Sequence, residues 1–316
     1  MHVVFREAQG LEETEIPMDL GQTPADLVVL SFSDSDLGAF SEGWKKEREG
    51  LPSLRLANLV ALKHPLSVDT YIDQTLSGAK GILIRLIGGV QYWEYGLNQV
   101  YQLAQEKGIA LAVLPADGRE DTRLDEYSTI PKSTLQRLKK LTDTGGSKAA
   151  AAALAQLAIA AGLYAAPIIG DKSLPEVGYW SLEKGVVSEF VSSKNSQVVS
   201  IIFYRSFLAS EDMAAVEKLS DAFVLLGYQV IGIFSPTLKN PKYGLWVQKA
   251  IEDLQPVAII NATSFSSKGA DGYSPLDIST APIFQVAFST SNRKSWVDAC
   301  RGLSPTDLVM HVVLPE

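Results

Sequence analysis

One segment of the sequence combines a cation, two glycines and an aromatic ring. Arg85 lies late in the apolar run Gly81–Ile87, and Gly88, Gly89 and Tyr92 follow it. Backbone N–H groups at a glycine-rich helix start suit a carboxylate, as does a fork-shaped guanidinium, and an aromatic ring suits a flat ligand. Glycines serve tight turns just as often, so a turn with packed aromatic side chains is an equal alternative.

A second polar segment consists of Ser33, Asp34, Ser35 and Asp36, which follow the apolar run Asp26–Phe32. Serine and aspartate at the start of a helix satisfy its free N–H groups and interact favourably with its dipole. Helix capping is therefore the simpler interpretation, and hydrogen bonding to a ligand is the alternative.

Three further loops carry polar side chains. Two of them follow predicted strands and are expected at one rim, namely Tyr204, Arg205 and Ser206, and Asn261, Thr263 and Ser264. Open parallel sheets bind ligands at the carboxyl ends of their strands, although such side chains also satisfy loop backbone groups. The third loop has mixed charge and is predicted to be solvated surface; it contains Asp117, Arg119, Glu120, Asp121 and Arg123.

The elements that position these loops are predicted from short apolar runs that alternate with helical patterns, which is typical of a parallel sheet with crossover helices. In the first half the predicted strands are Asp26–Phe32, Gly81–Ile87 and Ile109–Leu114. The predicted helices run from Ser67 or Asp69 towards Gly78, and from Gln91 to Lys107 with a stop at Gly108. Two more helices, Ser133–Leu141 and Ser147–Leu163, either wrap the first domain or bridge to the next.

The second half repeats this pattern after an irregular segment, Gly170–Asn195, in which short edge strands are possible. Its predicted strands are Val198–Phe203, Tyr228–Phe234, Val257–Ile260, Ile283–Phe288 and Leu308–Leu314. Its predicted helices are Glu211–Leu226, capped by Ser210 and stopped at Gly227, then Leu245–Leu254 and one around Trp296. Helical spacing places five side chains of the first of these helices in the core: Met213, Val216, Leu219, Phe223 and Leu226.

The predicted fold class is therefore α/β, with two Rossmann-like parallel-sheet units joined by a helical and irregular segment. The first α/β domain is expected at residues 1–130, the connector at 131–196 and the second α/β domain at 197–316. A chain of this length exceeds what one hydrophobic core usually organises, which favours two domains.

Composition and missing motifs exclude several functions. A chain that is 46% hydrophobic with a net charge of -8 is packed and has no basic stripe for nucleic acid. The single cysteine, Cys300, favours a reducing compartment, so we expect the cytoplasm, and no run is long enough for a membrane span. There is no phosphate-binding Gly-x-x-x-x-Gly-Lys loop, no dinucleotide fingerprint and no Gly-x-Ser-x-Gly elbow. His2, His64 and His311 lack metal-ligand spacing, so the metal ligands stay unknown.

Several segments together resemble one family. They are Ser31–Leu37, Leu51–Leu59, Arg85–Gly89 with Tyr92 and Trp93, Tyr204–Ser206, Asn261–Thr263, Ser274–Asp277, Gly302–Pro305 and His311–Glu316. In this order they resemble the beginning of the cobaltochelatase large subunit, CobN, over nearly the whole chain. The same family includes the porphyrin-binding H subunit of magnesium chelatase, but the first two segments resemble the cobalt branch more closely.

The resemblance implies the N-terminal fragment of the large tetrapyrrole-binding subunit of an ATP-dependent cobaltochelatase. Such a ligase inserts Co²⁺, its substrate metal, into hydrogenobyrinic acid a,c-diamide in aerobic cobalamin biosynthesis. The partner subunits CobS and CobT, ATPases of the AAA+ type, use the ATP and Mg²⁺. Members of the family are several times longer, so the chain is expected to end at the start of the catalytic body and to be inactive alone.

Metal insertion requires groups that accept protons from the macrocycle or pass the metal to it. Within the implied family, Glu316 and His311 are the catalytic candidates, with a core position as the alternative for His311. The substrate-binding candidates lie on the predicted rims: Asp34, Ser35, Asp36, Arg85, Gly88, Gly89, Tyr92, Tyr204, Arg205 and Asn261. The alternatives are a magnesium chelatase H-type subunit, a docking module for the ATPase subunits without ligand contact, and an unrelated small-molecule receptor.

Overall fold

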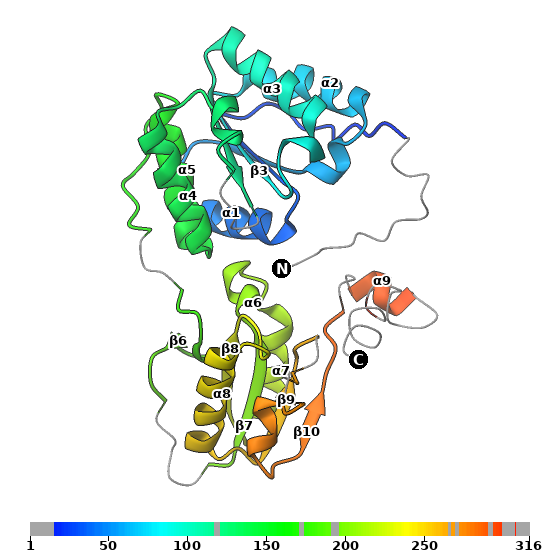
Figure 1. Ribbon diagram of the computed structural model, residues 1–316, viewed down its shortest axis with the longest axis vertical. Helices are drawn as coiled ribbons and strands as arrows, with labels where there is room; N and C mark the ends of the chain where they lie inside the picture. The colour runs from blue at the N-terminus through cyan, green and yellow to red at the C-terminus, as the bar shows by residue number, and fades with distance from the viewer. Residues whose placement is uncertain are drawn as a thin grey trace. The chain divides into compact units, whose positions relative to one another are not determined.

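The computed structural model describes residues 16–116, 121–170, 174–190, 196–264, 267–268, 272–289, 293–298 and 307. The chain divides into two compact units. The first comprises Met1–Leu174 with Ala209–Glu211, and the second comprises Pro175–Leu208 with Asp212–Glu316. Each unit contains its own sheet, as Figure 1 shows.

The first unit is built on a four-stranded parallel sheet with the order β2-β1-β3-β4. Its strands are β1 (Leu27–Ser31), β2 (Leu54–Asn58), β3 (Gly81–Leu86) and β4 (Ala110–Pro115). Every residue of β1, β3 and β4 is buried. Helices cover both faces of such a sheet, which is why these strands are continuous apolar runs in the sequence.

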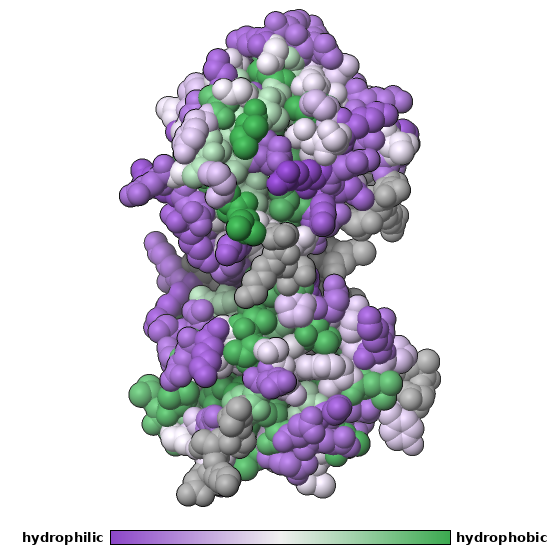
Figure 2. All heavy atoms as spheres, turned by 90° about the vertical axis from the view of Figure 1, so that its left-hand side faces the viewer, coloured by the Kyte–Doolittle hydropathy of each residue, from purple (hydrophilic) through white to green (hydrophobic). Residues whose placement is uncertain are grey.

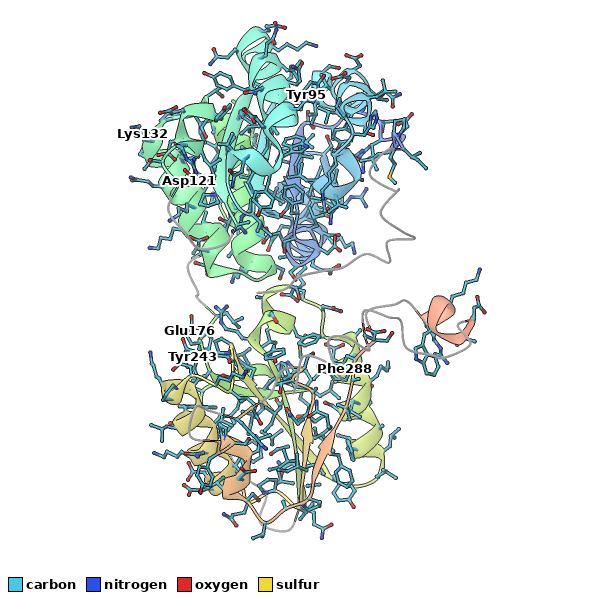
Figure 3. The ribbon with its side chains drawn as sticks, turned by 45° about the vertical axis from the view of Figure 1, so that its right-hand side comes forward. Tyr95, Asp121, Lys132, Glu176, Tyr243 and Phe288 are labelled. Carbon is cyan, nitrogen blue, oxygen red and sulfur yellow. The ribbon has the colours of Figure 1, made fainter. Side chains whose placement is uncertain are left out.

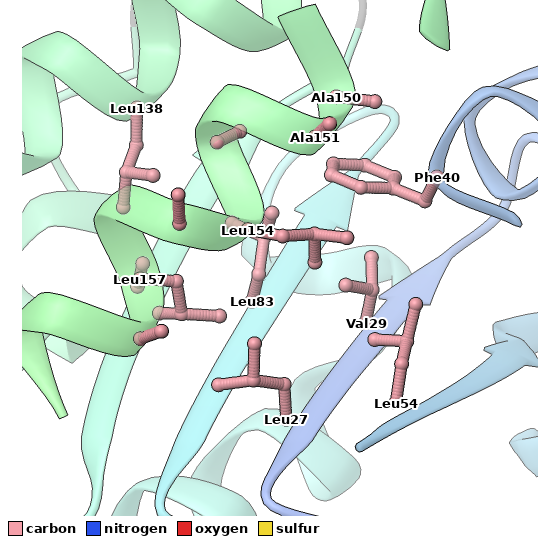
Figure 4. Close-up of a cluster of buried hydrophobic side chains, with 14 of the residues drawn as sticks. Leu27, Val29, Phe40, Leu54, Leu83, Leu138, Ala150, Ala151, Leu154 and Leu157 are labelled. Atoms are coloured by element: carbon pink, nitrogen blue, oxygen red, sulfur yellow. The ribbon is translucent and has the colours of Figure 1, made fainter. Parts of the chain in front are cut away.

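Alternate side chains of the first sheet pack on different helices. Leu27, Val29 and Leu83 point to the face covered by α1 (Asp34–Lys46), α4 (Lys132–Thr144) and α5 (Ser147–Ala160), as Figure 4 shows. Val28 and Ile84 point to the other face, against α2 (Pro65–Gln74) and α3 (Glu94–Lys107). Short 3-10 turns complete this unit at Arg48–Gly50, Leu59–Leu62, Leu76–Gly78, Val90–Tyr92 and Leu124–Tyr127.

The alanine-rich helix α5 lies very close to α1. A side chain added at Gly43 of α1 would collide with the backbone of Ser147 and Ala151 in α5. Small residues on both helices allow this approach, and the alanines of α5 are buried almost all round. The sequence left open whether these two helices wrap the first domain or bridge to the next. They wrap the first domain, because α4 and α5 pack on its sheet.

The second unit contains a six-stranded sheet with the order β10-β9-β7-β8-β5-β6. Four strands are parallel: β7 (Val198–Tyr204), β8 (Gln229–Ser235), β9 (Ala258–Asn261) and β10 (Ile283–Gln285). At one edge, β5 (Gly178–Ser181) and β6 (Gly185–Val187) form an antiparallel hairpin. The remaining elements are α6 (Arg205–Ala209), α7 (Ala214–Leu225), α8 (Pro241–Leu254), α9 (Arg293–Asp298) and a 3-10 turn at Pro275–Ile278.

The two units share one strand order. In each, the first parallel strand lies between the second and the third, and the fourth follows the third, as in β2-β1-β3-β4 and β8-β7-β9-β10. This is the beginning of the flavodoxin-like order of doubly wound folds. The predicted α/β class with two Rossmann-like units is confirmed. The residues expected to form a separate connector, 131–196, are divided between the two units.

Some predicted boundaries were wrong. The helix expected at Glu211–Leu226 begins only at Ala214 and is not capped by Ser210, because Glu211 has a φ of 58° that a helix cannot accommodate. Leu226, expected in the core, is 71% exposed because it follows the last turn of α7. The helix expected to open at Ser67 or Asp69 begins at Pro65. The strand expected at Leu308–Leu314 lies outside the described residues.

Candidate functional site

The carboxyl ends of β1 and β3 form the point at which the strand order of the first unit reverses. Ser31 and Arg85 are register partners there, each at or next to the end of its strand. Loops that leave two neighbouring strands in opposite directions open a crevice at such a point, which is where doubly wound sheets bind ligands. The predicted rim of the first unit therefore has the geometry expected of a binding edge.

The Ser-Asp-Ser-Asp segment caps α1 and ties it to β2. Ser33 is the N-cap, and its Oγ accepts a hydrogen bond of 3.2 Å from the backbone N–H of Asp36. Asn58, at the end of β2, donates from Nδ2 to Asp34 Oδ1 at 2.6 Å. The capping interpretation is thus correct for Ser33, while Ser35 is half-buried beside it.

Asp36 ties the same helix start to β1 and β3. Its Oδ2 accepts a hydrogen bond from Ser31 Oγ at 2.9 Å, and its Oδ1 accepts one from Arg85 Nη1 at 2.8 Å. With the bond between Asp34 and Asn58, the segment joins the ends of three adjacent strands. Its carboxylates are engaged within the protein, so their first effect is to fix the rim.

Arg85 is buried at this rim, with 5% of its surface exposed. Besides Asp36, it faces Asp143 near the end of α4, whose Oδ1 lies 3.5 Å from Nη2. Burial raises the pKa of the Asp143 carboxyl above its ordinary value, and the positive charges of Arg85 and Lys139 only partly offset this. A buried guanidinium is held in place when carboxylates balance its charge, which is what Asp36 and Asp143 do.

The glycine loop after β3 takes a conformation that other residues rarely adopt. Gly88 and Gly89 have φ values of 83° and 85°. The ring of Tyr92 lies against Gly88 and leaves no room for a side chain there, yet Tyr92 is 61% exposed. Trp93 instead turns into the core, where its Nε1 donates to the carbonyl of Leu62 at 2.8 Å. One exposed ring thus stands at the rim beside backbone that only glycine permits.

The mixed-charge loop reaches this glycine loop. A Cβ at Gly89 would lie 2.9 Å from Asp121 Oδ2 and 3.4 Å from Arg123 Nη2. Arg123 donates from Nε and Nη2 to the Asp121 carboxylate, each at 2.9 Å, and these bonds hold the pKa of Asp121 below its usual range. The pair lies at the surface as predicted, with Arg123 exposed and Asp121 half-buried beside the glycine loop; residues 117–120 lie outside the described part.

The rim of the second unit is also internally bonded. Asn261, buried at the end of β9, donates from Nδ2 to Gln285 Oε1 at 2.7 Å, and its Oδ1 accepts from Thr263 Oγ1 at 2.9 Å. These bonds fasten the end of β9 to the end of β10. Tyr204 ends β7. Arg205 follows as the first residue of α6, and its Nε donates to the carbonyl of Pro175 at 3.0 Å.

Two residues join this second rim that the sequence did not single out. Tyr243, on α8, donates from its hydroxyl to Glu176 Oε2 at 3.3 Å. Figure 3 labels both residues. Burial and the negative charge of Glu176 raise the pKa of the Tyr243 hydroxyl, and Arg205 partly offsets them. A phenol, a carboxylate and a guanidinium therefore act on one another at this edge.

No cluster of three or more histidine, cysteine, aspartate or glutamate side chains among the described residues is arranged to hold a metal ion. The catalytic candidates Glu316 and His311 lie outside the described residues. None of the helices within the described ranges is both long and apolar enough to cross a bilayer.

Comparison with known proteins identifies the family of this chain. Residues 141–316 match the family described as CobN/Magnesium Chelatase. The chain is 35% identical to the aerobic cobaltochelatase subunit CobN of Sinorhizobium sp and 30% identical to that of Pseudomonas aeruginosa. Both matches cover the whole chain and 26% of the relative, so the chain spans about a quarter of these relatives.

A solved structure shows the same fold. The catalytic subunit of cobaltochelatase from Mycobacterium tuberculosis superposes with a TM-score of 0.69 over 92% of this chain and 23% of that one, at 20% identity. This chain therefore shares the fold of part of that subunit. The chain belongs to the CobN/Magnesium Chelatase family, and the resemblance inferred from its motifs is confirmed.

Proposed function

We propose that this chain corresponds to the N-terminal part of the large tetrapyrrole-binding subunit of an ATP-dependent cobaltochelatase. The whole subunit would insert Co²⁺ into hydrogenobyrinic acid a,c-diamide in aerobic cobalamin biosynthesis, in the cytoplasm. The observation that carries this proposal is that two relatives named as aerobic cobaltochelatase subunit CobN align with the entire chain. The AAA+ partners CobS and CobT would hydrolyse ATP with Mg²⁺, in keeping with the absence of a phosphate-binding loop from this sequence.

The proposed role of the first unit is to hold one edge of the macrocycle. Hydrogenobyrinic acid a,c-diamide is a flat ring edged by carboxylates and amides. The exposed ring of Tyr92 offers it a flat apolar surface, and the guanidinium of Arg85 offers a carboxylate a fork of donors. Gly88 and Gly89 would contribute through the positive-φ loop conformation that lets Tyr92 and Asp121 lie against this backbone. Asp34, Ser35 and Asp36 would take part mainly by fixing this rim.

The second unit would contribute in the same way through Tyr204, Arg205 and Asn261. Asn261 is occupied with Gln285 and Thr263, so its proposed part is to set the shape of the loop that follows β9. Tyr204 and Arg205 would supply a hydroxyl and a cation to polar side chains of a macrocycle. Glu316 and His311 would accept protons or pass the metal in the whole subunit, and this chain alone would be inactive.

A docking module for the ATPase subunits is the second candidate, and the bonding of the rim favours it. Asp34, Asp36 and Arg85 are all paired within the first unit, as expected if their motifs serve the fold. Exposed apolar side chains would then control assembly, and the described residues include Tyr164, Ile169, Leu225 and Leu245 among them. Figure 2 shows hydrophobic residues on one face, scattered among hydrophilic residues. A porphyrin-binding magnesium chelatase subunit is the remaining alternative within the family.

The deciding experiment is an absorbance and fluorescence titration with hydrogenobyrinic acid a,c-diamide. It compares this chain, the whole subunit and a protoporphyrin control. Saturable binding of the corrinoid precursor by this chain supports a macrocycle site on its rims. Binding only by the whole subunit favours the docking module, and preference for protoporphyrin favours the magnesium branch. In the whole subunit, macrocycle affinity that is unchanged in Arg85→Ala and Arg205→Ala would rule out both guanidinium contacts.

A further inference from the structure

The guanidinium of Arg85 has one edge that is bonded well and one that is not. Nη1 donates to Asp36 Oδ1 at 2.8 Å, which is a strong charge-assisted bond. The partners of Nη2 are Asp143 Oδ1 and the carbonyl of Pro115, both at 3.5 Å, the outer limit of a hydrogen bond. Nε is buried and has no acceptor within reach among the described residues.

The poorly bonded edge is the one that guanidinium groups use for two-point recognition. Nε and Nη2 point the same way, so a single carboxylate can accept from both through two parallel bonds. Asp143 presents only one oxygen to this edge, and at long range. A buried donor without an acceptor is unfavourable, and a ligand that supplies one removes that penalty. The edge is thus better suited to another carboxylate than to the one beside it.

Asp143 lies on the more exposed side of this pair. Its side chain is 38% exposed, whereas that of Arg85 is 6% exposed. It is the penultimate residue of α4, which is followed by Gly145 and Gly146 with φ values of 73° and 85°. Burial raises the pKa of the Asp143 carboxyl, so its charged form is held less favourably here than in water. Asp143 is therefore the partner in this pair that solvent reaches more readily.

We infer that the Nε–Nη2 edge of Arg85 is a subsite for a ligand carboxylate and that Asp143 is its internal competitor. An incoming carboxylate displaces Asp143 and takes two short bonds where Asp143 makes one long contact. The charge balance of the buried guanidinium is kept because one carboxylate replaces another, while Asp36 stays in place on Nη1. That the ligand is a macrocycle edged by carboxylates rests on the proposed function. That Asp143 and an incoming carboxylate compete for Arg85 does not.

Two probes test the subsite separately from the ligand. The first is hydrogenobyrinic acid a,c-diamide, followed by absorbance, and the second is sodium propionate, followed through the Nε–H resonance of Arg85 in ¹H–¹⁵N spectra of this chain. Asp143→Asn and Asp143→Ala remove the competing charge. Glu106→Gln, an exposed change on α3, is the matched control, and Arg85→Lys removes the fork.

We expect Asp143→Asn and Asp143→Ala to bind the macrocycle about two- to fivefold more tightly than the unmodified chain, the effect of removing one half-exposed ion pair. The Arg85 Nε–H resonance should move at correspondingly lower propionate concentration, Glu106→Gln should match the unmodified chain, and Arg85→Lys should lose the response. The proposal that Asp143 competes for Arg85 is overturned if the Nε–H resonance responds equally to propionate with and without Asp143. It is also overturned if no variant responds. If propionate shifts the resonance but the macrocycle does not bind, the carboxylate subsite is supported and the macrocycle is ruled out as its ligand.

Discussion

Asp36 and Arg85 join the first turn of α1 to the end of β3 through an ion pair of 2.8 Å. Because Ser31 donates to the other oxygen of Asp36, one carboxylate fixes two neighbouring strands and a helix. Arg85 lies directly before Leu86, the last residue of β3, and the glycine loop follows. The rim of the first unit therefore depends on a contact between a helix and a strand that is far from it in sequence.

Replacing Asp36 by alanine should destabilise the first unit. The change leaves the buried guanidinium of Arg85 with Asp143 alone, and breaking a buried pair costs about 3 kcal/mol or more. Urea unfolding followed by tryptophan fluorescence measures this, because Trp44 and Trp93 belong to the first unit. Glu106→Gln should change the free energy of unfolding by less than about 0.5 kcal/mol. Equal stability of the two variants would show that the pair contributes little.

Gly89→Ala should be more destabilising than Gly108→Ala. Gly108 is in the left-handed helical region, where alanine costs about 1–2 kcal/mol, whereas Gly89, with φ 85° and ψ -169°, is in a region nearly confined to glycine. The Cβ at Gly89 also meets Asp121 and Arg123, whereas nothing lies within 4 Å at Gly108. Thermal unfolding of the two variants provides the comparison. A larger loss at Gly108 would contradict the packing described for the glycine loop.

Glu211 should make the stability of the first unit depend on pH. Burial alone would raise the pKa of its carboxyl, but hydrogen bonds from Ser147 and Lys46 outweigh it, so the pKa is lowered. A lowered folded-state pKa stabilises the protein at neutral pH, and this stabilisation is lost as the pH falls through that pKa, below about pH 4.

The variant Glu211→Gln isolates this contribution. Its free energy of unfolding should be lower than that of the unmodified chain at pH 7, and the difference should shrink as the pH is lowered below about 4. Chemical unfolding at a series of pH values measures the difference. A gap that widens on acidification would mean that the carboxyl is not held in its charged form by these contacts.

Tyr92→Ala should weaken macrocycle binding without much effect on stability. The ring is largely exposed, so its loss removes little buried area, but an aromatic contact with a flat ligand is worth about 0.5–1.5 kcal/mol, or roughly three- to tenfold in affinity. Titration of this chain with hydrogenobyrinic acid a,c-diamide gives the affinity. Tyr164→Ala, another exposed tyrosine of the first unit, should bind normally, and equal losses in both would point to non-specific contact.

The sequence predicted those elements that are buried on both faces. The runs ending near Ser31, Leu86 and Tyr204 are continuous and apolar, because helices cover both sides of these strands. The strand Leu54–Asn58 was missed because it is an edge strand whose side chains are partly exposed, so no apolar run marks it. The hairpin of β5 and β6 was anticipated only as irregular structure or short edge strands, since turns there leave a weak pattern.

The candidate site was predicted less completely, because its contacting residues are far apart in the sequence. Arg85 and Asp36 were each identified from their own loops, but their pairing follows from the register of β1 with β3. Asp143 was not identified, because nothing near α4 in the sequence indicates that its end reaches Arg85. Asp121 and Arg123 were predicted as surface charge, but their closeness to the loop, which the missing Cβ of Gly89 allows, was not predicted.

The shared strand order has a consequence for how the two units can diverge. Among the described residues, each sheet is enclosed by its own clusters of hydrophobic side chains, so each sheet has its own core. Substitutions in the loops after β1 and β3 can then change the side chains at that rim while the strand order that positions the rim is kept. The chain thus contains two sheets with the same order of parallel strands, and the residues of each rim can change while that order is kept.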